Sequence, residues 1–72
     1  MDQLHATFGA NVRRYREKRG WSQEDLAEKS GLHRTYISGV ERGVRNPTLI
    51  IIDRLAKALG MQPSELLRRH PE

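Results

Sequence analysis

Residues 22–43 read SQEDLAEKSGLHRTYISGVERG, and the first half of this stretch predicts a short helix. Ser22 can cap that helix, because its hydroxyl can accept a hydrogen bond from a backbone N–H left unpaired in the first turn. Acidic Glu24 and Asp25 follow in that turn, where the helix dipole favours negative charge. Gly31 then ends the helix, since glycine readily takes the left-handed conformation of a tight exit.

The second half of the stretch predicts another short helix, from about residue 33 to residue 42, which Gly43 closes. Two short helices joined by a tight glycine turn are the pattern of a helix-turn-helix, whose second helix fits the major groove of DNA. An ordinary helical hairpin has the same spacing, so spacing alone leaves both interpretations open. The residues on the outer face of the second helix decide between them.

The whole chain has 72 residues, which is the size of one small domain, and we expect a single domain over residues 1–72. The chain has no cysteine, so neither a disulfide nor a zinc–thiolate site can stabilise it. Aromatic residues make up only 6%, so the core must consist mainly of leucine, isoleucine, valine and alanine. This composition suits helices best.

The chain is basic, with a formal net charge of +4 and a sequence pI of about 10.1. Thirteen Lys and Arg residues outnumber nine Asp and Glu residues, and arginine dominates the basic set. The guanidinium group is a planar fork of donors that matches phosphates and guanine edges, so the bias favours a nucleic-acid partner. A solvated basic surface would give the same net charge and stays open on this observation.

No apolar run approaches the length of a membrane span, and the N-terminus lacks the apolar core of a secretory signal, so a cytoplasmic protein is expected. Catalytic patterns are also missing from the sequence. The histidines His5, His33 and His70 are dispersed, and no paired carboxylates or metal-ligand spacings surround them. No glycine-rich phosphate-binding loop is present, since Gly20, Gly31, Gly43 and Gly60 lie at expected helix ends. We therefore expect no enzyme activity, no metal and no cofactor.

A first helix is expected from about residue 3 to residue 18, with Asp2 as its cap. Its inward stripe has helical spacing and consists of Leu4, Phe8, Val12 and Tyr15. Gly20 ends this helix, and Trp21 follows it directly. Trp21 should pack against the start of the next helix as a hydrophobic staple, with contact to a DNA backbone as the alternative.

A fourth helix is expected over residues 49–59 with Thr48 as its cap, and a short fifth helix should open at Ser64. The inward face of the fourth helix consists of Leu49, Ile52, Leu55, Ala56 and Leu59. No stretch shows the pattern of a strand. The expected fold class is therefore all-α, a compact set of five helices with the helix-turn-helix at the second and third.

Residues 49–52 are four apolar residues in a row, which cannot all face one core, because a helix turns successive side chains to different sides. At least one should face outwards, and an exposed isoleucine on so small a domain suggests a partner surface. An incidental exposed side chain is the simpler alternative. We expect a dimer interface that consists of Ile50, Ile51, Leu66 and Leu67.

The second helix of the motif has a polar outer face. Helical spacing turns Ile37 and Val40 towards the core. The outer side consists of Arg34, Thr35, Ser38 and Arg42. Arginine can donate two hydrogen bonds to guanine O6 and N7, and serine and threonine can bond to donors or acceptors. Gly39 in mid-helix suggests the close approach of another helix or of DNA, and Tyr36 could be half-buried or give its hydroxyl to a phosphate.

A series of short motifs spans most of the chain. They are Arg16, Arg19-Gly20, residues 22–27, Gly31-Leu32, Ile37-Ser38, residues 40–43, residues 46–49 and residues 55–60. Each alone would be weak, but together they closely resemble the lambda-repressor and Cro-like helix-turn-helix family, the Xre type of bacterial and phage regulators. The resemblance implies a lambda-repressor-like fold of five helices. Within the family, residues 32–42 resemble the small controller proteins of restriction–modification systems, which are stand-alone domains of about this length.

The resemblance implies roles for the matching residues. The implied base-reading residues are Arg34, Thr35, Ser38 and Arg45. The expected phosphate contacts are Gln23, His33, Tyr36, Arg42 and Asn46. Gln23 also matches a glutamine that braces the second motif helix. Arg16 and Glu41 match a family ion pair that links the first helix to the end of the second motif helix.

The implied function is sequence-specific regulation of transcription by a homodimer that binds a palindromic operator in double-stranded DNA. The controller resemblance narrows this to a regulator of its own gene and of a restriction endonuclease gene, with RNA polymerase as a further expected partner. The alternative is a protein-interaction module, such as the antitoxin of a toxin–antitoxin pair, which can use the same fold. An antitoxin normally carries an extra segment for its toxin, and the few residues after Leu67 favour the regulator.

Overall fold

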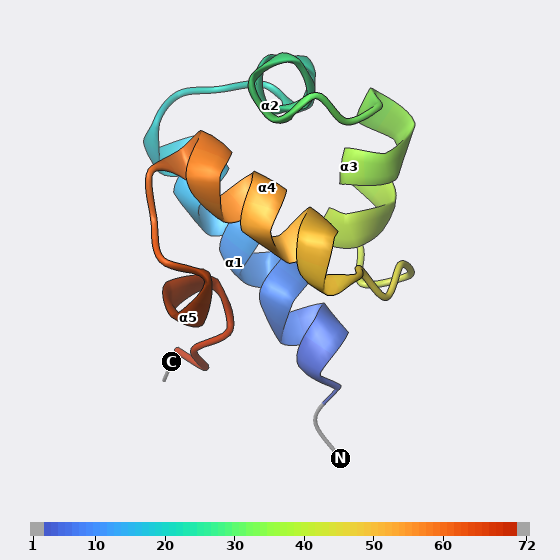
Figure 1. Ribbon diagram of the computed structural model, residues 1–72, viewed down its shortest axis with the longest axis vertical. Coiled ribbons are helices and arrows are strands. Elements are labelled where there is room, and N and C mark those ends of the chain that lie inside the picture. The colour runs from blue at the N-terminus through green and yellow to red at the C-terminus, as the bar shows by residue number, and fades with distance from the viewer. Residues whose placement is uncertain (1–2, 71–72) are drawn as a thin grey trace.

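Five helices collect the apolar residues of the chain into one core in the computed structural model, which describes residues 3–70 (Figure 1). In chain order they are α1 (Leu4–Lys18), α2 (Gln23–Ser30), α3 (Arg34–Glu41), α4 (Leu49–Leu59) and α5 (Pro63–Leu66). The described residues contain no strand, so the all-α prediction is confirmed. None of the helices formed by this part of the chain is both long and apolar enough to cross a membrane.

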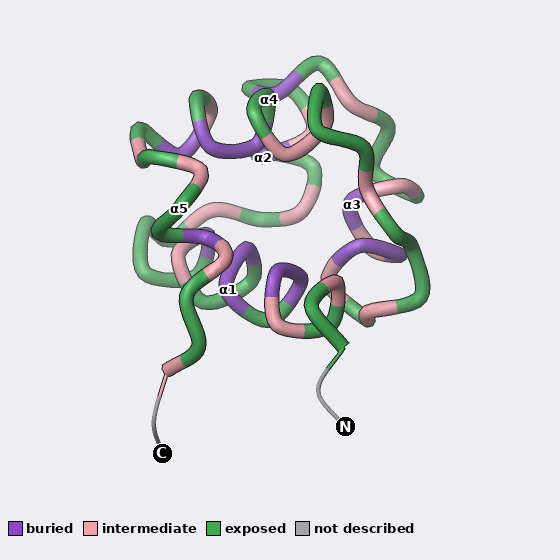
Figure 2. Tube along the Cα trace, turned by 60° about the horizontal axis from the view of Figure 1, so that its bottom comes forward, coloured by how far each residue is buried: buried purple, intermediate pink, exposed green. Residues whose placement is uncertain are grey.

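The long helices α1 and α4 cross at the centre of the molecule, and the shorter helices pack around them (Figure 1). α3 packs against α1 and α2, while α5 contacts both α1 and α4. All five helices turn buried residues inwards, as the purple segments of Figure 2 show. The buried apolar residues are Phe8, Val12, Leu26, Ile37, Val40, Leu55, Ala56, Leu59 and Leu66.

The helix starts at Ser22 and Thr48 are confirmed by side-chain caps. The Ser22 hydroxyl accepts from the Asp25 N–H at 3.0 Å, and the Asp25 carboxylate accepts from the Ser22 N–H at 2.8 Å. These bonds hold the pKa of Asp25 below its ordinary value, so this contribution to stability is present at neutral pH and is lost as acid protonates the carboxylate. Thr48 Oγ1 accepts from the Ile51 N–H in the same way.

Two leucines at helix starts do not lie where their spacing predicts. Leu4 is 51% exposed and Leu49 is 84% exposed, although both were expected on inward faces. Each is the first residue of its helix, and there the helix extends beyond the core that its later turns cover. The residue before Leu4, Gln3, holds the N-cap position of α1 without a side-chain bond, and the expected cap Asp2 lies outside the described residues.

The last helix begins at Pro63 and not at Ser64 as predicted. Proline is favoured at the first helical position, and the Glu65 carboxylate accepts from the Gln62 N–H at 2.9 Å. This start turns Leu66 fully into the core, where its exposed fraction is 0%. The prediction that Leu66 belongs to a dimer interface is therefore wrong, because the side chain is already covered within one copy.

Asn11 is a buried polar residue that joins α1 to the C-terminal segment. Its side-chain amide donates to the carbonyl oxygens of Leu66 at 2.8 Å and of Arg68 at 2.7 Å. The Leu66 carbonyl ends α5 and the Arg68 carbonyl follows it, and the helix itself offers neither of them a partner. One side chain therefore fixes a helix of only four residues to the body of the protein.

Gly9 lies at the closest approach of α1 and α3. A Cβ atom added to Gly9 would lie 1.9 Å from the carbonyl oxygen of Val40, a distance that no real pair of these atoms adopts. Gly9 itself is buried. The missing side chain therefore lets the backbones of the two helices touch, a role that helical spacing does not reveal.

Substituting Gly9 with alanine should destabilise the fold by about 3 kcal/mol or more, because the neighbouring atom is backbone and α3 would have to move. The free energy of unfolding, measured by denaturant titration followed by circular dichroism, tests this. The matched control is Ala10→Ser, which adds one heavy atom at an exposed position of the same helix and should change stability by less than about 0.5 kcal/mol. Equal effects of the two substitutions would contradict the close approach.

Candidate nucleic-acid interface

The outer face of α3 is polar and accessible, while its inner face is fully buried. Ile37 and Val40 have exposed fractions of 0%. On the other side Arg34, Thr35 and Arg42 are exposed and Ser38 is half-buried. The long and short polar side chains therefore lie together on one surface, as the spacing predicted.

The start of α3 presents free donors to the solvent. His33 Nδ1 accepts from the Thr35 N–H at 3.1 Å, so in the neutral ring Nε2 carries the proton and can donate outwards. The Arg34 side chain is 58% exposed and its Nε lies 3.9 Å from a carboxylate oxygen of Glu24. So long a contact at the surface adds little stability and leaves the guanidinium able to move to a ligand.

The end of α3 is held from inside the protein by Glu41. Its carboxylate accepts from Arg16 Nε at 2.7 Å and from a second guanidinium nitrogen of Arg16 at 3.0 Å. Gln23 at the start of α2 donates its side-chain amide to the same carboxylate at 3.1 Å. Glu41 therefore connects α3 to both α1 and α2.

The Arg16–Glu41 pair is almost completely removed from solvent, with side-chain exposures of 10% and 3%. A further Arg16 nitrogen donates to the carbonyl oxygen of Trp21 at 2.7 Å, between α1 and α2. Hydrogen bonding to Glu41 raises the pKa of Arg16 above its ordinary value, although burial opposes this. The guanidinium therefore stays charged throughout the accessible pH range.

Trp21 is half-buried and packs against the core, in agreement with the predicted packing role. Lys29 Nζ lies 4.7 Å from the centre of the Trp21 ring, and Arg19 Cζ lies 5.8 Å from it.

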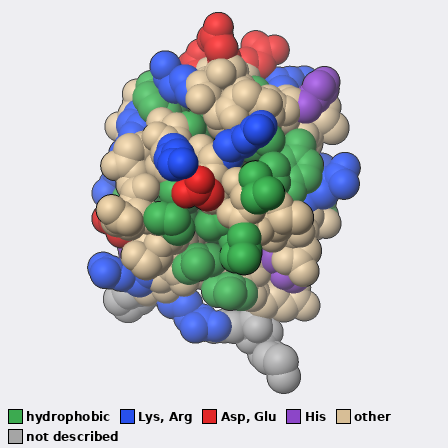
Figure 3. Space-filling view, in the orientation of Figure 1, with side chains coloured by type: hydrophobic (Ala, Val, Ile, Leu, Met, Phe, Trp, Pro, Cys, Tyr) green, Lys and Arg blue, Asp and Glu red, His purple; other side chains and the backbone are tan. Residues whose placement is uncertain are grey.

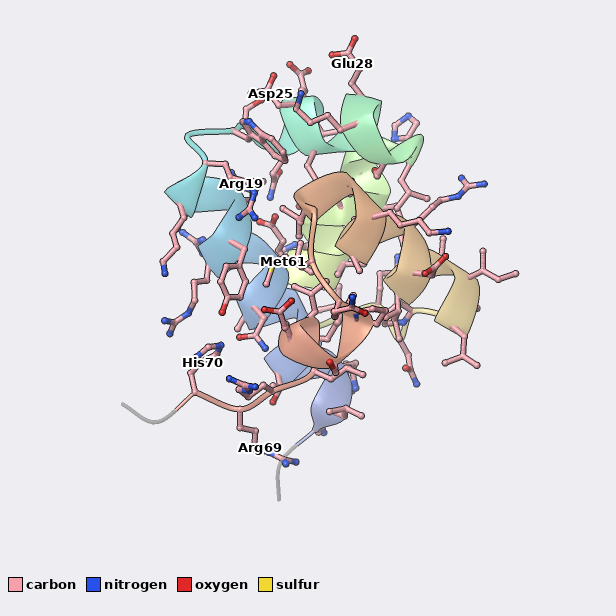
Figure 4. All side chains as sticks on the ribbon, turned by 60° about the vertical axis from the view of Figure 1, so that its left-hand side comes forward. Arg19, Asp25, Glu28, Met61, Arg69 and His70 are labelled. Carbon is pink, nitrogen blue, oxygen red and sulfur yellow. The ribbon has the colours of Figure 1, made fainter. Side chains whose placement is uncertain are left out.

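Arg19 also donates to the carbonyl oxygen of Leu59 at 2.6 Å and thereby connects the ends of α1 and α4. In Figure 4 Arg19 lies at this junction, while His70 turns back towards α1, where its Nε2 is 3.4 Å from the hydroxyl of Tyr15.

The loop after α3 places Arg45 and Asn46 in exposed positions near that helix. The guanidinium carbon of Arg45 lies 5.5 Å from the ring centre of Tyr36, which is half-buried. The stem of Arg45 passes beside Gly39. Gly39 was expected to admit another helix or DNA. Its nearest neighbour within the protein is the side chain of Arg45 and not another helix.

The residues expected at a dimer interface separate into different environments. Ile50 is 71% exposed, Ile51 and Leu67 are half-buried, and Leu66 is buried. Leu49 is even more exposed than Ile50 and was missed, because helical spacing assigned it to the core. Figure 3, in the same orientation as Figure 1, shows hydrophobic side chains gathered on the face where α4 lies in front.

A small hollow of about 60 Å³ opens beside Leu67. Its lining residues are Leu4, His5, Phe8, Asn46, Pro47, Ile52 and Leu67. The volume suits one side chain and is far below that of a pocket for a small-molecule ligand. No group of three acidic, His or Cys residues placed to hold a metal ion is found among residues 3–70.

Glu41→Gln should lower the free energy of unfolding by about 3–5 kcal/mol, because it leaves the Arg16 charge buried without its partner. Denaturant unfolding measures the loss. The matched control is Asp53→Asn, which breaks the exposed pair of Asp53 and Lys57, whose atoms lie 3.0 Å apart. That change should stay within about 0.5 kcal/mol. A loss at Glu41 no larger than at Asp53 would contradict the central role of the buried pair.

Known proteins share this sequence and architecture. Residues 12–66 match the family model HTH_3, described as Helix-turn-helix. Control protein C.BamHI of Bacillus amyloliquefaciens is 51% identical over 65 residues, which cover 89% of this chain and 80% of that protein. Control protein C.SmaI of Serratia marcescens is 58% identical over 59 residues, which cover 82% of this chain and 70% of that protein.

The crystal structure of the restriction-modification controller protein C.AhdI from Aeromonas hydrophila superimposes with a TM-score of 0.83 and 50% sequence identity. The match covers 86% of this chain and 94% of that chain. The family model extends over α2 and α3 together with most of the core that supports them. The chain therefore belongs to the helix-turn-helix family HTH_3 and is similar to restriction–modification controller proteins.

Proposed function

We propose that the protein is a sequence-specific transcriptional regulator that binds double-stranded DNA with α3 in the major groove. The observation that carries this proposal is the difference between the inner and outer faces of α3. Its inner face and its end are bound to the body through the core and Glu41, and its outer face has no structural partner of comparable strength. A surface that is held rigidly but left polar and accessible is suited to recognition.

The proposed base-reading set is Arg34, Thr35, Ser38 and Arg45. Arginine donors can distinguish guanine from the other bases, and the short hydroxyl side chains let the helix approach the base edges closely. The proposed phosphate contacts are Gln23, His33, Tyr36, Arg42 and Asn46. Gln23 gives one amide hydrogen to Glu41 and keeps a second donor for a phosphate. His33 keeps its Nε2 for the same purpose.

We propose further that two copies act as a homodimer on a palindromic operator, because a single α3 contacts only a few base pairs. The proposed contact surface consists of Leu49, Ile50, Ile51 and Leu67, the last of which lines the hollow. Leu49 and Ile50 are the most exposed large apolar residues of the described chain. Two copies joined about a two-fold axis would place their α3 helices in successive major grooves, about 34–36 Å apart.

The similar relatives support a more specific role in restriction–modification. Two of them are control proteins, and a solved structure with the same architecture is a restriction–modification controller protein. We therefore propose that this protein regulates its own gene and the gene of a restriction endonuclease, with RNA polymerase as the partner at the promoter. Measurement of transcription from the adjacent promoters, with and without the protein, tests this role.

Arg34→Ala should weaken binding to the selected operator by about 1–3 kcal/mol and relax the preference at one base pair, because it removes a base contact. Binding to duplexes selected from a random pool, measured by fluorescence anisotropy at fixed salt, tests this. The control Arg68→Ala removes the same charge two residues after the end of α5. Because α5 lies on the opposite side of the molecule from α3 (Figure 1), this control should leave the preference unchanged.

Two outcomes would count against the proposal. Equal weakening of selected and random duplexes by Arg34→Ala would assign Arg34 to the phosphate backbone. A wild-type protein that selects no duplex but captures a partner protein would instead support the antitoxin alternative. Wild-type affinity should also fall steeply as salt rises, because phosphate contacts release counterions.

The double substitution Leu49→Ser with Ile50→Ser should raise the dimer dissociation constant by about tenfold or more, since it removes apolar area that the contact would bury. Sedimentation equilibrium measures the change. The control Val44→Ser replaces another exposed apolar residue, 65% accessible in the loop after α3, and should not alter association. Association that responds equally to both variants would place the contact elsewhere.

A further inference from the structure

We propose that Gly39 determines DNA sequence specificity, because its missing side chain forms a slot that holds Arg45 along α3 with its guanidinium on the ring of Tyr36. This inference rests on the proposed DNA-binding function and adds a mechanism to it. It assigns Gly39 and Tyr36 as positioning residues for Arg45. Neither residue needs to contact a base for this role.

The backbone after α3 turns back towards the helix and thereby brings Arg45 to it. The Gly43 N–H donates to the carbonyl oxygen of Val40, and the Val44 N–H donates to that of Gly39, both at 3.0 Å. Gly43 has a φ of +75°, and this pair of bonds is the Schellman ending of a helix. Arg45 therefore starts from a fixed backbone position beside the last turns of α3.

The slot itself is defined by the stem of Arg45. A Cβ atom added to Gly39 would lie 2.7 Å from Arg45 Cγ, 3.3 Å from Nε and 3.6 Å from Cδ. The first distance is shorter than real Cβ contacts allow. Any residue other than glycine at this position must therefore push the arginine stem away from the helix.

Tyr36 supports the far end of the same side chain. It lies one turn before Gly39 on the same side of α3, and its ring packs partly against the core. The guanidinium carbon of Arg45 lies 5.5 Å from the ring centre, within the range of a cation–π contact. The arginine is thus held at its base by the turn, along its stem by the slot and at its tip by an aromatic ring.

This support distinguishes Arg45 from Arg34, the other long side chain proposed to read bases. Arg34 has only a contact of 3.9 Å to an exposed carboxylate. An exposed arginine that moves freely loses conformational entropy when it binds, whereas one that is already held loses less. Holding the guanidinium in place also limits which base pair it can reach.

Gly39→Ala makes this role testable without loss of the fold. Alanine is the better helix former, and the only atoms that must move belong to the exposed side chain of Arg45. The melting temperature of this variant should be equal to or above that of the wild type. A change in specificity would then come from the slot and not from instability.

The experiment starts from duplexes that the wild-type protein selects from a random pool. Their affinities, and those of all single-base-pair variants, are measured for wild type, Gly39→Ala and Arg45→Ala. Both variants should bind the selected duplex about 5- to 100-fold more weakly and should lose preference at the same base pair. Unchanged preference in Gly39→Ala would overturn the inference.

The double variant Gly39→Ala with Arg45→Ala separates the slot from a direct clash with DNA. If Gly39 acts through Arg45, the alanine at position 39 should cause no further loss once the arginine is gone. If Gly39→Ala weakens binding by the same factor whether residue 45 is arginine or alanine, the added Cβ meets DNA directly and the inference fails.

Tyr36 tests the slot independently of position 39. Tyr36→Phe keeps the ring and should retain the preference at that base pair, whereas Tyr36→Ala should lose it. Equal weakening of selected and random duplexes by Tyr36→Phe would support the phosphate contact proposed for the hydroxyl and would leave the role of the ring intact. A preference that Tyr36→Ala retains would overturn the positioning role. If the wild-type protein selects no duplex, the proposed function itself is refuted. If the wild type selects a duplex and Gly39→Ala keeps the same base-pair preference, only this inference is refuted.

Discussion

The buried contact between Arg16 and Glu41 is the constraint on which the rest of the structure depends. Two charges removed from water add little net stability, because desolvation offsets much of their attraction. They do impose geometry, since the guanidinium fits a carboxylate in few orientations. Glu41 also binds Gln23, so one carboxylate sets the relative positions of α1, α2 and α3. The outer surface of α3 is therefore not needed to stabilise the fold.

α1 and its C-cap residue Arg19 supply three side chains that connect distant parts of the chain. Arg16 binds α3, Asn11 binds the carbonyls after α5, and Arg19 binds the last carbonyl of α4. A core of nine buried apolar residues is small, and short helices leave many backbone groups unpaired at their ends. Polar side chains from one central helix solve both problems. Every buried side-chain nitrogen and oxygen in the described part of the chain has a partner.

Local chemistry decides what the sequence can predict. The caps at Ser22 and Thr48 and the burial of Ile37 and Val40 follow from neighbours a few residues away, and they were predicted. The proposed site residues on α3 follow from the same helical spacing together with a family resemblance. The roles of Gly9, Asn11 and Gly39 depend on what another segment brings to them. The exposure of Leu4 and Leu49 depends on where the core ends, and a periodic pattern carries no information about that limit.

The turn between α3 and α4 has a consequence for how such a protein could evolve. The first residues of this turn are bonded to the end of α3, and α3 and α4 both pack on the same core. In a dimer joined through α4, the rotational phase between the two half-sites would then depend on the α4 contact alone. One inserted base pair turns a half-site by about 35° around the duplex axis, since a turn holds 10–10.5 base pairs. Base preference could change by substitutions on α3, whereas half-site spacing could change only by rebuilding the contact at Leu49 and Ile50.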